Sequence, residues 1–163
     1  MNILILYDSV FGNTAKVAEA MKNSVPEGHR VSAIKFDAFT MDMLKNLDVL
    51  VVGSPTRAFR PTPAISDLLK RLPSDALAQG IHTVAFDTRV SLKDVNSKFL
   101  NMMVALFGYA AEPIDKLLLK RGGTQLAEPK WFYVNGKEGP LKSGELESAA
   151  AWMNELLARL PMN

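Results

Sequence analysis

The chain contains no cysteine, only two histidines and almost no excess of charge of either sign. Without cysteine it cannot form disulfides, thiolate metal sites or cysteine-ligated clusters, and it has no cysteine nucleophile. His29 and His82 are not accompanied by other ligands at a metal-binding spacing. The 19 basic and 17 acidic side chains leave a formal net charge of +2, which gives no reason to expect nucleic acid as a partner.

Long hydrophobic runs are also missing. The longest apolar runs, residues 3–6 and 49–52, are far too short to span a bilayer, and no positively charged segment precedes the first of them. We therefore expect no membrane partner, no signal peptide and a cytoplasmic location. The length of 163 residues and a composition that is 48% hydrophobic and 22% charged predict one globular domain over residues 1–163.

What the sequence does contain is an alternation of apolar strands and amphipathic helices. Residues 2–7 and 48–53 are apolar without a polar alternate face, a pattern typical of strands buried on both faces of a parallel sheet. Strands are predicted at residues 2–7, 30–36, 48–53, 81–87 and 124–134, the last interrupted at Pro129, and helices at residues 14–24, 41–46, 63–71, 94–107, 112–121 and 143–160. Ser143 is the expected N-cap of the last helix, and Leu146 is expected to face inward. This order predicts an α/β fold, a doubly wound five-stranded parallel sheet with helices on both faces.

The segment after the first predicted strand offers the groups that bind a phosphate. Ligands of doubly wound sheets bind at the carboxyl ends of the strands. Residues 9–14 supply two hydroxyls, one amide and a run of backbone N–H groups where a helix begins, and such a run binds phosphate without a cation. The segment is neither a Walker A loop nor a Gly-x-Gly-x-x-Gly turn. The alternative is an ordinary turn in which Gly12 permits the reversal and Thr14 caps the helix.

The hexapeptide Ser9-Val10-Phe11-Gly12-Asn13-Thr14 resembles the flavodoxin pattern Ser/Thr-x-x-Gly-Asn-Thr, and it stands at the same place, directly after the first strand. Two further segments are similar to the flavin loops of that family: Gly53-Ser54-Pro55-Thr56 after the third strand and Phe86-Asp87-Thr88-Arg89 after the fourth. The resemblance extends over the whole chain, including residues 132–141 and 145–152. It implies FMN as the cofactor.

The resemblance also assigns residues to the cofactor. It implies that the FMN phosphate is held by Ser9, Val10, Phe11, Gly12, Asn13 and Thr14. One side of the flavin ring would be lined by Ser54, Pro55, Thr56, Arg57, Ala58 and Phe59, and the other side approached by Asp87, Thr88 and Arg89. It implies no catalytic side chain, because the flavin carries the chemistry and the protein sets its potential and access.

The sequence departs from the family in two ways. Flavodoxins usually hold the flavin between two aromatic rings. Here Phe59 is the only aromatic residue in the loop after the third strand, and no aromatic follows Asp87 until Phe99, so that Arg89, Val90 or nothing is left to cover the second face. Flavodoxins are also usually acidic, whereas this chain carries Arg57, Arg60 and Arg89 where the flavin is expected. Such arginines favour a reduced, anionic flavin if they face it, and they are ordinary solvated charges if they do not.

Three functions are compatible with the sequence. The first is an FMN protein that shuttles electrons to or from a redox partner protein. The second is an FMN-dependent NAD(P)H or quinone oxidoreductase, since one fold hosts both activities. The third is a binding or regulatory module that uses the phosphate site for another ligand or for none. The colour of the purified protein separates the third from the first two.

Overall fold

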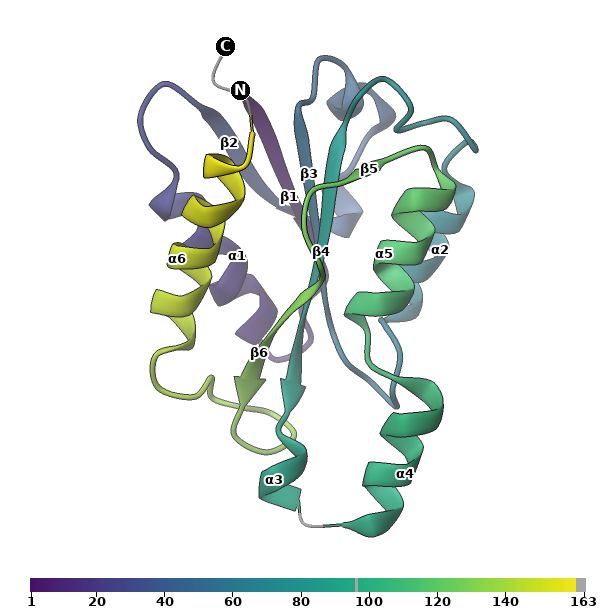
Figure 1. The fold of residues 1–163 in the computed structure, drawn as a ribbon, viewed down its shortest axis with the longest axis vertical. Helices are drawn as coiled ribbons and strands as arrows, with labels where there is room; N and C mark the ends of the chain where they lie inside the picture. Colours follow the sequence, from purple (N-terminus) through teal and green to yellow (C-terminus); the bar gives the residue numbers. More distant parts are fainter. Residues whose placement is uncertain (96, 161–163) are drawn as a thin grey trace.

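The computed structural model of the chain describes residues 1–95 and 97–160, and its centre is a parallel β-sheet (Figure 1). The strands are β1 (Asn2–Tyr7), β2 (Arg30–Lys35), β3 (Val49–Pro55), β4 (His82–Val90), β5 (Thr124–Gln125) and β6 (Lys130–Val134). Their order is β2-β1-β3-β4-β5, and β6 also pairs with β4. β5 and β6 lie along successive parts of β4, so they occupy one position in the sheet. The predicted five-stranded parallel sheet, with its last strand interrupted near Pro129, is confirmed.

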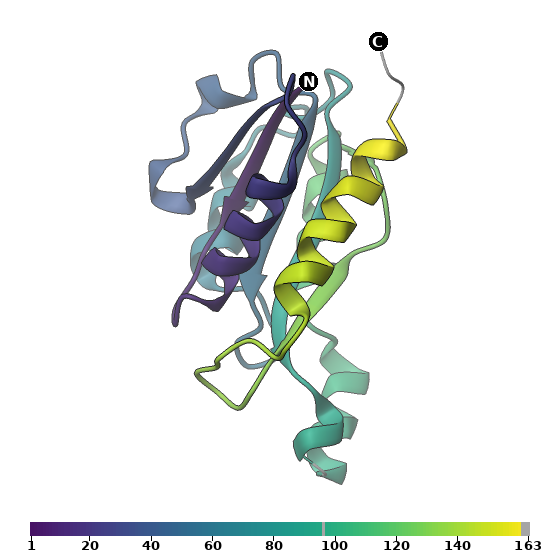
Figure 2. The same cartoon turned by 90° about the vertical axis from the view of Figure 1, so that its left-hand side faces the viewer.

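Helices cover both faces of this sheet, as predicted. They are α1 (Asn13–Ser24), α2 (Pro63–Arg71), α3 (Leu92–Val95), α4 (Lys98–Phe107), α5 (Ala111–Lys120) and α6 (Glu145–Ala158), with two 3₁₀ turns at Phe36–Ala38 and Met41–Leu44. α1 and α6 lie together on one face, and α2 and α5 lie on the other (Figures 1 and 2). α3 and α4 extend beyond the carboxyl ends of the strands, at the end opposite to the N-terminus (Figure 1).

The two-faced burial of the central strands explains these layers. Successive side chains of a strand point to opposite faces. In β1, Ile3 and Ile5 therefore join the core beneath α1 and α6, whereas Leu4 and Leu6 join the core beneath α2 and α5. All four are nearly inaccessible to solvent, as are Val49 to Val52 of β3. A strand with no polar face can be placed only inside such a three-layer arrangement.

The structure corrects four local predictions. The fourth strand does not end at residue 87 but continues to Val90, because it keeps pairing with β6 after its pairing with β3 ends. The helix predicted at 94–107 is two helices, α3 and α4, and Asn96 within it lies outside the described residues. The N-cap of α6 is Gly144 in the left-handed conformation rather than Ser143, and Leu146 is 38% exposed rather than buried. Within residues 1–95 and 97–160, no helix is both long and apolar enough to cross a membrane.

Gly53 provides a test of how tightly β3 packs against β4. A Cβ atom at this position would lie 2.1–2.6 Å from three ring atoms of Phe86, which is fully buried. Gly53→Ala should therefore lower the free energy of unfolding by about 1–3 kcal/mol, measured by chemical denaturation. The loss should shrink in a Phe86→Leu background, since the ring that causes the overlap is then absent. Equal losses in the two backgrounds would contradict this packing.

Candidate functional site

A cleft lies at the carboxyl edge of the sheet, where the loops after β1, β3 and β4 meet. Eleven of the fifteen residues predicted from the sequence line it: Val10, Phe11, Asn13, Thr14, Pro55, Thr56, Arg57, Ala58, Phe59, Thr88 and Arg89. The other four, Ser9, Gly12, Ser54 and Asp87, do not line the cleft but support the residues that do. The cleft has a narrow part beside α1 and a wider part of about 770 Å³ that reaches α3 and α4.

The loop before α1 is built to leave its backbone N–H groups open. Gly12 is the N-cap of α1 and has a φ of 84°, a left-handed conformation that glycine adopts without strain. The Ser9 hydroxyl accepts a hydrogen bond from the N–H of Ala15 at 3.2 Å, and the carbonyl of Gly12 accepts one from Lys16. These bonds satisfy the third and fourth N–H groups of the helix. For Val10 to Thr14, the described residues provide no acceptor for the five consecutive backbone N–H groups.

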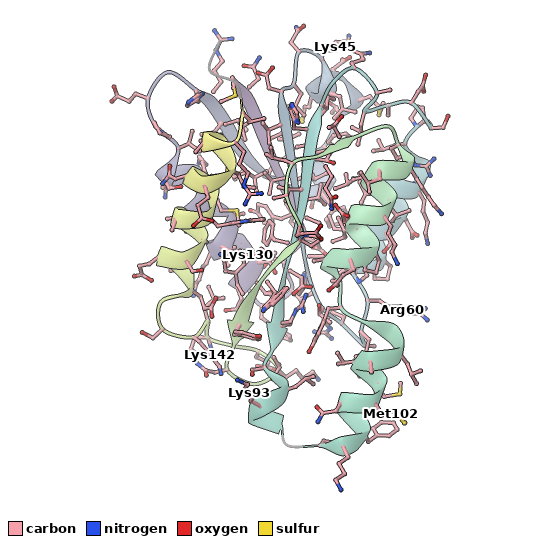
Figure 3. The ribbon with its side chains drawn as sticks, in the orientation of Figure 1. Lys45, Arg60, Lys93, Met102, Lys130 and Lys142 are labelled. Carbon is pink, nitrogen blue, oxygen red and sulfur yellow. The ribbon has the colours of Figure 1, made fainter. Side chains whose placement is uncertain are left out.

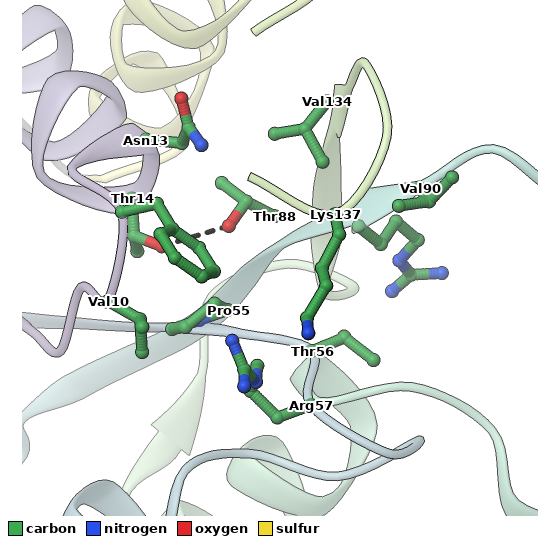
Figure 4. Close-up of a pocket in the computed structure, with 12 residues that line it drawn as sticks. Val10, Asn13, Thr14, Pro55, Thr56, Arg57, Thr88, Val90, Val134 and Lys137 are labelled. Carbon is green, nitrogen blue, oxygen red and sulfur yellow. Dashed lines mark hydrogen bonds between the residues drawn. The ribbon is translucent and has the colours of Figure 1, made fainter. Parts of the chain in front are cut away.

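Two hydrogen bonds with distant parts of the chain hold this loop in place. The Thr14 hydroxyl lies 2.9 Å from the hydroxyl of Thr88 on β4, as the dashed line in Figure 4 shows. The amide of Asn13 donates a hydrogen bond of 2.9 Å to the carbonyl of Glu138, in the loop after β6. Gly139 packs so closely there that a Cβ atom would lie 2.5 Å from the Asn13 amide. Asn13 therefore connects the start of α1 to the loop after β6.

The loop after β3 forms one wall of the cleft. Ser54 is fully buried, and its hydroxyl accepts a hydrogen bond from the N–H of Thr62 at 2.9 Å. Arg57 and Arg60 exchange two backbone hydrogen bonds around a tight turn. Both central residues of that turn, Ala58 and Phe59, have positive φ values, 46° and 65°. Non-glycine residues are uncommon in this region and cost of order 1 kcal/mol each, so the surrounding contacts must fix the turn.

Asp87 and Arg89 form a buried ion pair inside β4, rather than in a loop after it. Residues two apart on a strand point to the same face. Arg89 Nε accordingly donates to Asp87 Oδ1 at 2.6 Å, and the backbone N–H of Ala111 donates to Asp87 Oδ2 at 2.9 Å. Burial raises the pKa of Asp87, while the Arg89 guanidinium and the Ala111 N–H oppose that rise. Asp87 thus anchors both Arg89 and the first turn of α5.

The Arg89 guanidinium also contacts aromatic rings that the sequence analysis did not assign to the site. Its Cζ lies 3.5 Å from the ring centroid of Tyr109 and 4.8 Å from that of Trp131. Tyr109 lines the wider part of the cleft together with Phe59. Tyr109 thus supplies an aromatic ring besides Phe59, which corrects the expectation that only Arg89, Val90 or nothing could cover the second face. The one feature of the sequence that could have indicated Tyr109 is its position after Gly108, in the short turn between α4 and α5.

Positive charge dominates the cleft. Its described lining contains Arg57, Arg89 and Lys137, and no aspartate or glutamate. Lys137, from the loop after β6, and Arg57 reach into the same narrow cavity (Figure 4). Lys137 was not predicted, because nothing in its local sequence distinguishes it from a solvated lysine. Arg60, expected near the ring, lines a separate groove instead. No cluster of three potential metal-ligating His, Cys, Asp or Glu side chains occurs in the described part of the chain.

The buried ion pair generates a prediction about stability. Asp87→Ala leaves the Arg89 guanidinium buried without its carboxylate, and breaking a buried pair in this way costs about 3–5 kcal/mol. Asp42→Ala is the matched control, since it breaks the exposed pair that Asp42 forms with Lys45 at 2.7 Å, which contributes less than about 1 kcal/mol. Urea denaturation of the two variants measures both losses. A loss at Asp87 as small as that at Asp42 would contradict the assigned role of the pair.

Comparisons with known proteins agree with this arrangement at the level of the fold. No protein-family model and no curated protein sequence matches the chain. Among solved structures, oxidised flavodoxin 1 from Bacillus cereus superposes with a TM-score of 0.73 at 15% identity and covers 99% of this chain and 100% of its own. A flavodoxin from the domain Archaea gives 0.72 at 18% identity, covering 98% of each chain. Rubredoxin oxygen:oxidoreductase from Desulfovibrio gigas gives 0.70 at 19% identity, covering 99% of this chain and 37% of its own. The chain therefore has the flavodoxin-like fold that its sequence resemblance predicted.

Proposed function

We propose that this protein binds FMN in the cleft and transfers electrons to or from a redox partner protein. The observation that carries the proposal is the run of five backbone N–H groups, from Val10 to Thr14, without an acceptor among the described residues. Unpaired N–H groups at a helix N-terminus form a binding site for a phosphate group. The 12 residues of α1 add the favourable end of a helix dipole.

The remainder of the cleft also suits a flavin mononucleotide. A carboxylate in the cleft would repel a dianionic phosphate, and the described lining contains no carboxylate. The wider part of the cleft adjoins the phosphate-binding loop and is lined by Phe59 and Tyr109, which supply the aromatic surface that a planar ring needs. When bound, the flavin supplies the redox chemistry, and the protein provides binding, charge and access.

The comparisons favour an electron carrier over the oxidoreductase alternative. The flavodoxins match this chain from end to end, whereas one enzyme among the neighbours, rubredoxin oxygen:oxidoreductase, is matched over 37% of its length. The fold of the present chain therefore corresponds to the whole of the carriers and to one part of the larger enzyme. No residue of the cleft needs to act as an acid or a base in this proposal.

The phosphate site predicts a preference for FMN over riboflavin. Riboflavin lacks the phosphate and leaves the N–H groups of Val10 to Thr14 without a ligand. FMN should bind at least about a hundredfold more tightly, since two charge-assisted hydrogen bonds contribute about 3 kcal/mol or more. Quenching of flavin fluorescence on titration measures both affinities. Thr14→Val should weaken FMN by about 1.5–3 kcal/mol, and Thr14→Ser should retain most of the affinity. Equal affinities for the two flavins would remove the basis of the proposal.

The charges of the cleft predict how the potential of bound flavin responds to mutation. Arg57 and Lys137 line the cleft, whose described lining contains no carboxylate, whereas Arg89 is paired with Asp87 and Arg60 lines a separate groove. Arg57→Gln or Lys137→Gln should each lower the two-electron midpoint potential by about 20 mV, which corresponds to about 1 kcal/mol of attraction to a reduced anionic flavin. Arg60→Gln is the control and should change it little. Spectroelectrochemical titration gives these values, and an equal shift in all three variants would contradict the assignment.

A further inference from the structure

A second concave surface lies beside the cleft, on the other side of α4. It is a groove of about 610 Å³ between α2, α5 and the end of α4. Its apolar lining consists of Pro61, Pro63, Leu106, Pro113 and Leu117. Four cations also line the groove, Arg60, Lys70, Lys116 and Lys120, with Asp67 as the only carboxylate among the described residues there. The groove thus has an excess of three positive charges, whereas the entire chain has an excess of two.

The outer face of α4 continues this apolar surface. Phe99, Met102 and Leu106 are 63%, 51% and 67% exposed, and their spacing of three and four places them on one side of the helix. Val104 is on the opposite side and lines the cleft. Figure 3 shows Met102 and Arg60 projecting from this end of the molecule. Side chains this large are rarely gathered in the open unless another molecule covers them.

We propose that this face, the groove together with the outer side of α4, is the docking site for the redox partner, and that the partner presents an acidic segment with apolar side chains at its centre. This inference rests on the proposed function and adds the chemistry of the partner to it. The four cations of the groove take part in none of the ion pairs found among the described residues, so their charge is available to a partner. Such complementary charge steers association and fixes orientation.

Position supports the same conclusion. α4 separates the groove from the cleft, with Val104 on one side and Leu106 on the other. The loop after β3 also lies between the two cavities, since Phe59 lines the cleft and the next residue, Arg60, lines the groove. A helix is about 10 Å in diameter, so a partner in the groove comes within one helix of a flavin in the cleft.

Two other occupants fit the face less well. In a twofold dimer the same patch meets itself, which would bring Arg60, Lys70, Lys116 and Lys120 against their own copies. A membrane is flat, whereas the apolar residues Pro61, Pro113 and Leu117 line a groove. An acidic protein segment satisfies both the charge and the concave shape.

The test uses the FMN-loaded, isotopically labelled protein and two synthetic amphipathic helices as probes. Both peptides carry leucines along one face; one has glutamates beside them and the other has lysines at the same positions. The acidic peptide should bind at least tenfold more tightly, should shift the amide signals of α2, α4 and α5, and should lose affinity as salt rises. Lys116→Glu combined with Lys120→Glu should weaken it at least tenfold, and Leu106→Asn should also weaken it.

Controls separate this inference from the proposed function. Lys45→Glu combined with Arg159→Glu makes the same change of charge away from the groove and should leave peptide binding unaffected. FMN affinity, measured in every variant, should not change. If the parent protein binds FMN but does not bind the acidic peptide, the docking site alone is overturned. The docking site is also overturned if both peptides bind equally well, or if the amide signals that shift lie outside α2, α4 and α5. Binding of phosphatidylserine vesicles in place of the acidic peptide, or a dimer that Leu106→Asn dissociates, would contradict it too.

Discussion

Parallel pairing of β1, β3 and β4 is the constraint on which the rest of this structure depends. Ile3 lies opposite Val49, and Val49 opposite His82, so the three strands start together and run in one direction. Their carboxyl ends consequently reach one edge, and the loops that follow them emerge side by side. Thr14 and Thr88 are 74 residues apart in the sequence, yet their hydroxyls touch because of this register. The cleft exists because the sheet brings these loops together.

The positive charge of the cleft depends on the hydrogen bonds made by one buried carboxylate, that of Asp87. Asp87 is the one acidic residue of β4, and its two oxygens accept hydrogen bonds from Arg89 and from the N–H of Ala111. It can offset only the charge of Arg89. Arg57 and Lys137 line the cleft and take part in none of the ion pairs found among the described residues, and the net charge of +2 for the chain does not reveal this local excess. The distribution of charge, rather than its sum, determines what this edge of the protein attracts.

α4 connects the two concave surfaces of the molecule. It is the most apolar of the helices beyond the sheet edge, with Val104 on its cleft side and Phe99, Met102 and Leu106 on its outer side. A helix packed on the sheet would bury one face and expose polar residues on the other. α4 instead presents apolar side chains in both directions, because it lies between two concave surfaces.

The sequence by itself determined the order of strands and helices, the parallel sheet and the loop before α1, because buried strands such as Val49–Val52 and the Gly12 turn are encoded by neighbouring residues. It also placed eleven of the fifteen expected residues at the cleft. Only the tertiary structure decided which groups contact Arg89 and that Tyr109 and Lys137 line the cleft. It also placed Arg60 outside the cleft. These outcomes depend on contacts between segments far apart in the sequence. They also depend on the continuation of β4 to Val90, which no residue pattern near Val90 predicts because it follows from the pairing of β4 with β6.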